Sequence, residues 1–217
     1  MKKSFAAVVV EDAVVLVLGS MPGEASLRAG QYYAHPHNLF WKFIFACAGV
    51  EFSTDYARRC EVLSTLRIAL WDVLQQCRRE GSLDSSIEKE SEHPNDIAGL
   101  LKKLPQVRKI CFNGQKAFSS FKHHVLKVSP DLANRYQLVV LPSTSPANAS
   151  QSYQNKFTRW QSELLSCSCA PACVAVAKQG KCNRNWNRQF WLTLLKIGIE
   201  WFCWTIPILA VILDVAG

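Results

Sequence analysis

The stretch VVLVLGSMPG, residues 14–23, joins a short apolar run to a cluster of turn-forming residues. Its first five residues are all aliphatic, which is the pattern of a strand that is buried on both faces of a sheet. Two further runs of strand length, residues 109–112 and 137–141, also end abruptly in clusters of Gly, Pro, Ser or Asn. We therefore predict three strands, each followed by a polar loop.

Helical spacing separates these strands. Apolar residues recur every three or four positions at Trp41, Ile44, Phe45 and Ala48, then at Leu66, Leu70, Val73 and Leu74, then at Ile97, Leu100, Leu101 and Leu104. Strands that alternate with helices predict an α/β fold, namely a three-layer α/β/α arrangement around a central, mainly parallel sheet. Ligands of such sheets bind beyond the carboxyl ends of the strands. We therefore expect a site in the loops GSMPG, FNGQKA and LPSTSPAN.

The N-terminal segment MKKSFAAVVVEDAVVLVLG has the basic start and apolar run of a signal peptide, but Glu11 and Asp12 interrupt the run. We predict two short strands joined by a turn at these two residues. Cysteines in the first 166 residues stand singly within apolar or helical patterns, at Cys47, Cys60, Cys77 and Cys111. This usage predicts buried thiols in a reducing compartment, and hence an intracellular protein.

Charge and motifs limit the classes of function. The formal net charge is +8, and basic residues also outnumber acidic ones within residues 1–166, which favours a polyanionic partner. The chain has no phosphate-binding lysine loop, no GxGxxG and no cluster of carboxylates that would hold magnesium. Nucleotide hydrolysis and nuclease activity are therefore disfavoured.

The segment 167–217 differs in composition from the rest of the chain. It combines CSCAPACVAVAKQGKC with an apolar run over residues 190–213, which Lys196, Glu200 and Pro207 interrupt. Its cysteine spacing does not match that of zinc sites, so we predict no metal. We expect a catalytic domain over residues 1–166 and an atypical tail over 167–217. The tail is a membrane anchor, an amphipathic helix docked on the domain or a non-native C-terminus, and membrane contact is the less favoured reading.

The loop after the first strand continues as GEASLRAGQYYAHPHNLFW, residues 23–41. Pro36 suits the first position of a helix, which we expect to end near Gly49. Asn38 would then lie in the first turn of that helix, at the mouth of the strand-end site. Helix capping is the alternative role for such an asparagine.

Five blocks of the chain resemble the motifs of the uracil-DNA glycosylase superfamily in their order and spacing. They cover about residues 8–165 and read LGSMPGEASLRAGQYYAHPHNLFW, LWDVLQQCRREGSLDSSI, HPNDIAGLLKKLP, ICFNGQKAF and LPSTSPAN. The chain looks most similar to the hypoxanthine-DNA (deoxyinosine) glycosylase branch. The mismatch-specific uracil and thymine glycosylases are similar in AHP.N.FW, but they carry an asparagine where this chain has Ser20. The resemblance therefore implies that Asn38 is the catalytic residue, and it disfavours uracil as the preferred base.

An asparagine suits the chemistry that the resemblance implies. Cleavage of an N-glycosidic bond passes through an oxocarbenium-like sugar and needs a positioned water rather than a covalent nucleophile. The side-chain carbonyl of Asn38 can orient that water, and its NH₂ group can donate to the substrate. No cofactor is required.

Other residues of the three loops are candidates for contacts with a flipped base. Tyr33 corresponds to the stacking aromatic of the mismatch-specific enzymes, whereas we expect Tyr32 to pack beneath the loop. Asn113 is expected to read the base edge, with a turn-forming Asn-Gly as the alternative. The remaining base-binding candidates are Ser20 and the backbone amides of Met21 and Gly23.

The third loop is expected to contact DNA outside the base pocket. Ser143 and Ser145 suit phosphate contacts, and Thr144 to Ala147 suit an approach to the minor groove, although an ordinary Pro-rich connection is the alternative. We expect His35 to be structural or to contact substrate. Asp72 is expected to lie on a helix, either solvated or in a structural pair.

We predict a monomeric DNA repair glycosylase of base excision repair, monofunctional, that removes hypoxanthine from double-stranded DNA. Two alternatives remain. One is a broader glycosylase that also acts on uracil or xanthine. The other is an inactive DNA-binding or membrane-tethered adaptor.

Overall fold

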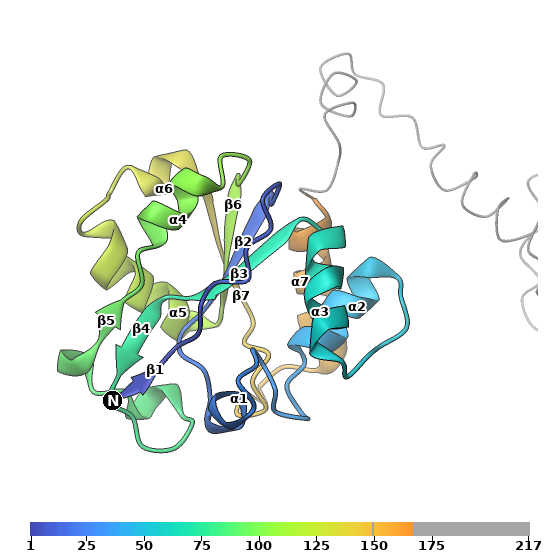
Figure 1. Ribbon diagram of the computed structural model, residues 1–217, viewed down its shortest axis with the longest axis horizontal. Coiled ribbons are helices and arrows are strands. Elements are labelled where there is room, and N and C mark those ends of the chain that lie inside the picture. The colour runs from blue at the N-terminus through green and yellow to red at the C-terminus, as the bar shows by residue number, and fades with distance from the viewer. Residues whose placement is uncertain (149, 167–217) are drawn as a thin grey trace, which may run out of the picture. The chain divides into compact units, whose positions relative to one another are not determined.

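A four-stranded parallel sheet forms the centre of the computed structural model, which describes residues 1–148 and 150–166 (Figure 1). The strand order is β3-β2-β6-β7. The strands are β2 (Val15–Gly19), β3 (Ile68–Asp72), β6 (Lys109–Asn113) and β7 (Gln137–Leu141). Neighbouring strands pair in parallel, and Gly19 lies opposite Asp72 at the carboxyl end of the β2–β3 pair.

Helices cover both faces of this sheet (Figure 1). One face carries α2 (Phe40–Ala48), α3 (Tyr56–Thr65) and α7 (Tyr153–Leu165), and the other carries α4 (Ile97–Lys103), α5 (Gln115–Ser120) and α6 (Leu132–Arg135). Side chains of a strand alternate between faces. Val15 and Val17 therefore enter the core beneath α2, α3 and α7, whereas Leu16 and Leu18 enter the core beneath α4 and α5. The predicted three-layer α/β/α fold is confirmed.

Smaller elements flank the sheet. A short antiparallel sheet has the order β1-β4-β5, with β1 at Lys2–Lys3, β4 at Leu74–Cys77 and β5 at His93–Pro94. Helix α1 (Glu24–Ala29) follows the first strand-end loop, and a π-helical segment, Phe121–Leu126, continues α5. Two 3-10 turns, Asp84–Ser86 and Lys89–Ser91, lie between β4 and β5.

The predicted helix through Leu66, Leu70, Val73 and Leu74 is wrong. Helix α3 ends at Thr65, Arg67 adopts a left-handed backbone conformation (φ 56°), and β3 begins at Ile68. The run IALW packs into the sheet as a mostly buried strand, and periodicity alone does not separate such a strand from a buried helical segment. The three predicted strands are present within one residue of their expected ends.

The N-terminal segment differs partly from the prediction. A turn lies at Glu11 and Asp12, as expected, but the residues just before it form only an isolated bridge from Val8 to Leu70. No helix within residues 1–148 and 150–166 is long and apolar enough to cross a membrane. The expectations for the tail fall outside the described residues.

The strand order places a topological switch point between β2 and β6. From β2 the chain crosses to β3 on one side, and it later returns to β6 and β7 on the other side. A crevice opens at the carboxyl ends of strands where connections diverge in this way. The loops after β2 and β6 therefore flank the expected ligand position, and Figure 1 shows these loops together with α1 at one edge of the sheet.

A buried ammonium group ties the start of β6 to the end of α7. Lys109 is 2 % exposed, and its Nζ donates to the Glu163 carboxylate at 2.8 Å and to the Ser166 hydroxyl at 2.7 Å. It also donates to the backbone carbonyl of Glu163. The last turn of α7 is therefore part of the folded unit.

We expect Lys109→Met to lower the free energy of unfolding by about 2 kcal/mol, because Glu163 and Ser166 lose a buried charged donor while the exposed Arg159 still pairs with Glu163. Equilibrium denaturation in urea measures this loss. The exposed Lys103→Met serves as the control and should change stability by less than about 0.5 kcal/mol. Equal stability of the two variants would contradict the assigned role of Lys109.

Candidate functional site

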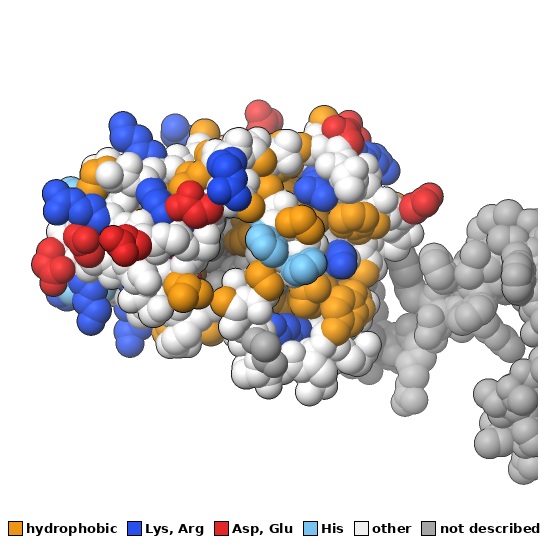
Figure 2. All heavy atoms as spheres, turned by 90° about the horizontal axis from the view of Figure 1, so that it is seen from below, with side chains coloured by type: hydrophobic (Ala, Val, Ile, Leu, Met, Phe, Trp, Pro, Cys, Tyr) orange, Lys and Arg blue, Asp and Glu red, His pale blue; other side chains and the backbone are white. Residues whose placement is uncertain are grey.

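A pocket of about 350 Å³ lies at the switch point of the sheet. All of the sequence-predicted site residues except Thr144 line it, namely Ser20, Met21, Gly23, Tyr33, Asn38, Asn113, Ser143, Ser145 and Ala147. Figure 2 views the molecule from this side and shows a hollow with histidine side chains beside it. Residues that are far apart in the sequence thus meet in one concave site, whose volume is within the usual range for small-molecule pockets.

Asn38 lies just before α2 rather than in its first turn. The helix begins at Phe40, and residues 35–37 form a turn that the bond from Asn38 N–H to the His35 carbonyl closes at 2.9 Å. The Asn38 Oδ1 accepts a hydrogen bond from the Phe40 backbone N–H at 2.9 Å. This bond closes an Asx turn just before the helix, whose N-cap is Leu39, and it orients the amide while leaving the second lone pair of Oδ1 available.

Thr144 is buried and does not lie on the pocket surface. Its backbone N–H donates to Asn113 Oδ1 at 2.9 Å, and its hydroxyl accepts from Asn113 Nδ2 at 2.8 Å. Its carbonyl accepts from the Leu39 N–H at 3.0 Å. With no exposed surface, Thr144 is not placed for the expected contact with DNA, whereas Ser143, Ser145 and Ala147 reach the surface.

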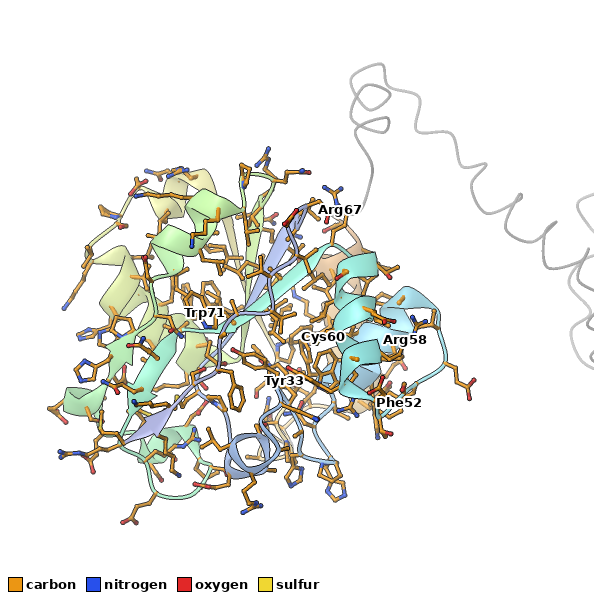
Figure 3. The ribbon with its side chains drawn as sticks, viewed as in Figure 1. Tyr33, Phe52, Arg58, Cys60, Arg67 and Trp71 are labelled. Carbon is orange, nitrogen blue, oxygen red and sulfur yellow. The ribbon has the colours of Figure 1, made fainter. Side chains whose placement is uncertain are left out.

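The two tyrosines of the first loop take different positions. Tyr32 is 2 % exposed and packs in the core, as expected, with its hydroxyl donating to the Ala6 carbonyl at 3.2 Å. Tyr33 lies near the carboxyl ends of the strands (Figure 3) and stacks on Phe40 with a centroid separation of 4.2 Å. Its φ of 52° is uncommon for a residue with a side chain, and such strain is concentrated at functional sites.

Gly19, Asp72 and Tyr33 approach one another closely where they line the pocket. A Cβ on Gly19 would overlap the Asp72 carboxyl and would lie 2.9 Å from the Tyr33 hydroxyl. The glycine therefore makes room for both polar groups at the end of β2. The Tyr33 hydroxyl is buried without a hydrogen-bond partner in the described part of the chain, and burial, together with the nearby Asp72, raises its pKa.

Asp72 is a buried carboxyl at the end of β3, not a group on a helix. Its Oδ2 accepts from the Ser4 hydroxyl at 2.7 Å, and its side chain lines the pocket. Burial raises the pKa of Asp72 to about 7, and the hydrogen bond from Ser4 opposes that rise. The predicted position of Asp72 is wrong because residues 68–72 form a strand rather than part of a helix.

Asp84 lines the pocket and Arg79 contacts Asp84. Both belong to the block LWDVLQQCRREGSLDSSI, but neither is among the predicted site residues. Asp84 comes from the 3-10 turn between β4 and β5, and its Oδ2 accepts from the Ser20 hydroxyl at 2.7 Å. Arg79 donates to Asp84 Oδ1 at 3.4 Å and to the Pro22 carbonyl. A charged residue in a polar connection gives no local signal of this role, because only the fold brings residues 79–84 against the first strand-end loop.

The histidines of this face do not form a metal centre. His35 lines the pocket, and its Nδ1 accepts from the His37 backbone N–H at 3.1 Å. Within the described ranges, no group of three His, Cys, Asp or Glu side chains is arranged to hold a metal ion.

The buried Asp72 predicts a pH dependence of stability. Its pKa rises from the ordinary 3.8 to about 7 on folding, so within this window the folded state keeps a proton that the unfolded state has lost. The contribution of Asp72 to stability is therefore largest at low pH and decreases as pH rises through the window. Relative to the unsubstituted protein, Asp72→Asn should gain stability from about pH 4 to pH 7, by up to about 1.4 kcal/mol per pH unit.

Urea denaturation at a series of pH values measures this difference. Asp131→Asn, at an exposed carboxylate, should run parallel to the unsubstituted protein. A constant difference between Asp72→Asn and the unsubstituted protein across the window would contradict the raised pKa.

Comparisons with known proteins agree with this geometry. The model of the uracil DNA glycosylase superfamily matches residues 7–166. A hypoxanthine DNA glycosylase of Methanosarcina acetivorans is 38% identical over 162 residues, which are 74% of this chain and 96% of that protein. A hypoxanthine DNA glycosylase of Methanosarcina barkeri is 34% identical over 160 residues, or 73% of this chain and 95% of the relative.

A solved structure shows the same fold. The solution NMR structure of a candidate uracil DNA glycosylase from Methanosarcina acetivorans superposes with a TM-score of 0.63 at 37% identity, covering 75% of this chain and 96% of that one. The switch-point pocket, the family model and these relatives support one assignment: the chain belongs to the uracil DNA glycosylase superfamily.

Proposed function

We propose that this protein is a monofunctional DNA glycosylase that hydrolyses the N-glycosidic bond of a deaminated base, above all hypoxanthine, in double-stranded DNA. The observation that carries the proposal is the pocket at the switch point, where Asn38, Tyr33 and Asn113 meet. The curated relatives named hypoxanthine DNA glycosylase support the choice of base, since they match almost their full length.

Asn38 is the proposed catalytic residue. Its amide is oriented by the Phe40 N–H, and it borders a pocket large enough to admit a flipped base. The carbonyl positions the attacking water and faces the cationic sugar, while much of the bond cleavage precedes attack and no strong base is needed. The lining residues include no lysine, and Lys116 of α5 pairs with Glu92 instead. An amine for a lyase step is therefore missing from the described pocket wall.

Base recognition is assigned to groups around the same pocket. Tyr33 presents a ring held by Phe40, which suits stacking against a flat base. Asn113 is held by Thr144, and its amide keeps one N–H and one lone pair for the base edge. Ser20 and the backbone of Met21 and Gly23 complete the binding set.

DNA binding is assigned to the third loop and its surroundings. Ser143, Ser145 and Ala147 border the pocket mouth, where phosphates and the minor groove would approach. An adjoining hollow of about 690 Å³ includes Lys116 and Arg159, which can neutralise phosphates. We propose that the protein acts as a monomer with residues 1–166 as its catalytic domain.

Single-turnover excision from duplexes with deoxyinosine, deoxyuridine or deoxyxanthosine tests this function. The protein should excise hypoxanthine fastest, and Asn38→Ala should slow excision by about 100- to 10,000-fold, because the amide acts mainly in the transition state. Duplex affinity should stay within a few-fold. Asn38→Ser retains an oxygen that can accept from the Phe40 N–H, so a similar loss of rate in both variants separates catalysis from the stability of this turn.

The outcomes distinguish the alternatives. Near-normal excision by Asn38→Ala would remove this residue from the catalytic role. Equal rates on the three bases would favour the broader glycosylase, and no excision of any base together with tight duplex binding would favour the inactive adaptor.

Salt should weaken the binding of the duplex. Each phosphate that a Lys or Arg neutralises contributes about −0.9 to the slope of log affinity against log salt. With a handful of such contacts, we expect a slope of about −3 or steeper, measured by fluorescence anisotropy at several salt concentrations. Arg159→Gln should make the slope shallower by about one, because its half-exposed guanidinium borders the hollow and its partner Glu163 keeps Lys109. Lys103→Gln, in the last turn of α4, should not change the slope. A slope near zero would contradict a phosphate-led interface.

A further inference from the structure

Asp84 holds a fixed position on the wall of the pocket. Its two carboxylate oxygens accept from different donors, Oδ2 from the Ser20 hydroxyl and Oδ1 from the Arg79 guanidinium. Its side chain is 40% exposed, and it borders both the pocket and the adjoining hollow. Each carboxylate oxygen keeps a further lone pair, so Asp84 can accept another hydrogen bond from a ligand.

The Arg79 side chain favours the charged form of Asp84. The guanidinium is fully buried, and it also donates to the Pro22 carbonyl. A buried cation is costly without an anionic partner, and Asp84 is the carboxylate that contacts it. Burial raises the pKa of Asp84, while the Ser20 hydrogen bond and the Arg79 charge oppose this rise. Lys116 and Glu92 also act on Asp84 electrostatically, with opposite signs.

One feature separates hypoxanthine from adenine, the base from which it forms by deamination. Hypoxanthine and uracil carry a ring N–H beside a carbonyl, whereas their parents adenine and cytosine carry a ring nitrogen lone pair beside an amino group. A fixed acceptor at the ring nitrogen therefore pairs with a deaminated base and meets a lone pair on the parent base. A neighbouring donor, such as the N–H of Asn113, pairs with the carbonyl of hypoxanthine but meets the amino group of adenine, which is itself a donor.

We propose that Asp84 is a specificity-determining residue that accepts the ring N–H of the flipped base, held in place for that role by Ser20 and Arg79. The inference rests on the proposed glycosylase function and adds the group that distinguishes hypoxanthine from adenine. The Asp84 carboxylate offers only acceptors, and its bonds to Ser20 and Arg79 hold its orientation. A site built to receive an N–H in this way rejects an analogue without it far more strongly than an apolar pocket rejects a change in size.

The test compares deoxyinosine with deoxyadenosine, in which a ring nitrogen lone pair replaces the N–H and an amino group replaces the carbonyl. In single turnover, the ratio of hypoxanthine to adenine excision should be about 10- to 100-fold lower in Asp84→Asn than in the unsubstituted protein. The amide of the variant can donate to the adenine ring nitrogen, which the carboxylate cannot do. The ratio of the two substrates within one variant does not depend on the fraction of folded protein. Glu88→Gln removes an exposed negative charge from the same connection and should keep the full ratio.

If excision by Asp84→Asn is too slow to time, the affinities of free hypoxanthine and adenine, measured by calorimetry, supply the same ratio. An unchanged ratio in Asp84→Asn, with an active unsubstituted protein, would overturn the assignment of Asp84 alone. Failure of the unsubstituted protein to excise hypoxanthine would overturn the proposed function and this inference with it.

Discussion

The hydrogen bonds of Thr144 connect the parts from which the pocket is built. Thr144 bonds to both polar atoms of the Asn113 amide at the end of β6, since its N–H donates to Oδ1 and its hydroxyl accepts from Nδ2. Its carbonyl accepts from the Leu39 N–H just before α2. The loop after β7 is thereby fixed to the end of β6 and to the turn that carries Asn38. Because Thr144 is fully buried, these bonds are not exchanged for bonds to water, and a lost partner would leave a buried polar group unsatisfied.

Around this connection the site contains several polar groups that a protein interior usually excludes. Asp72 and Arg79 are both buried, and the Tyr33 hydroxyl is buried without a partner in the described part of the chain. Gly19 allows the approach of Asp72 and Tyr33 because it has no side chain. Such groups cost stability, and their concentration beside one pocket is typical of a site that is organised for function. The apolar cores on the two faces of the sheet hold this arrangement in place.

Much of the fold is predictable from local patterns. The runs that form β2, β6 and β7 are short, apolar and bounded by turn residues, and the loops after them line the pocket. The ordered motif blocks indicate the family, which the family model confirms over residues 7–166. The amino-acid sequence alone points to Asn38, Tyr33 and Asn113 because they occupy those loops and blocks. Their proximity in space follows from the parallel sheet, whose carboxyl ends share one edge.

The sequence by itself therefore determined which segments form most of the parallel sheet and which loops carry the site, since aliphatic runs and turn residues act locally. Only the tertiary structure decided the rest. The run at β3 became a strand because it fills the edge of the sheet, and this placed Asp72 in the pocket rather than on a helix. Thr144 became internal through contacts with Asn113, 31 positions away, and Asp84 reached the pocket wall through its bond to Ser20, 64 positions away. Burial and pairing at such separations depend on the complete packing of the chain, and no local pattern encodes them.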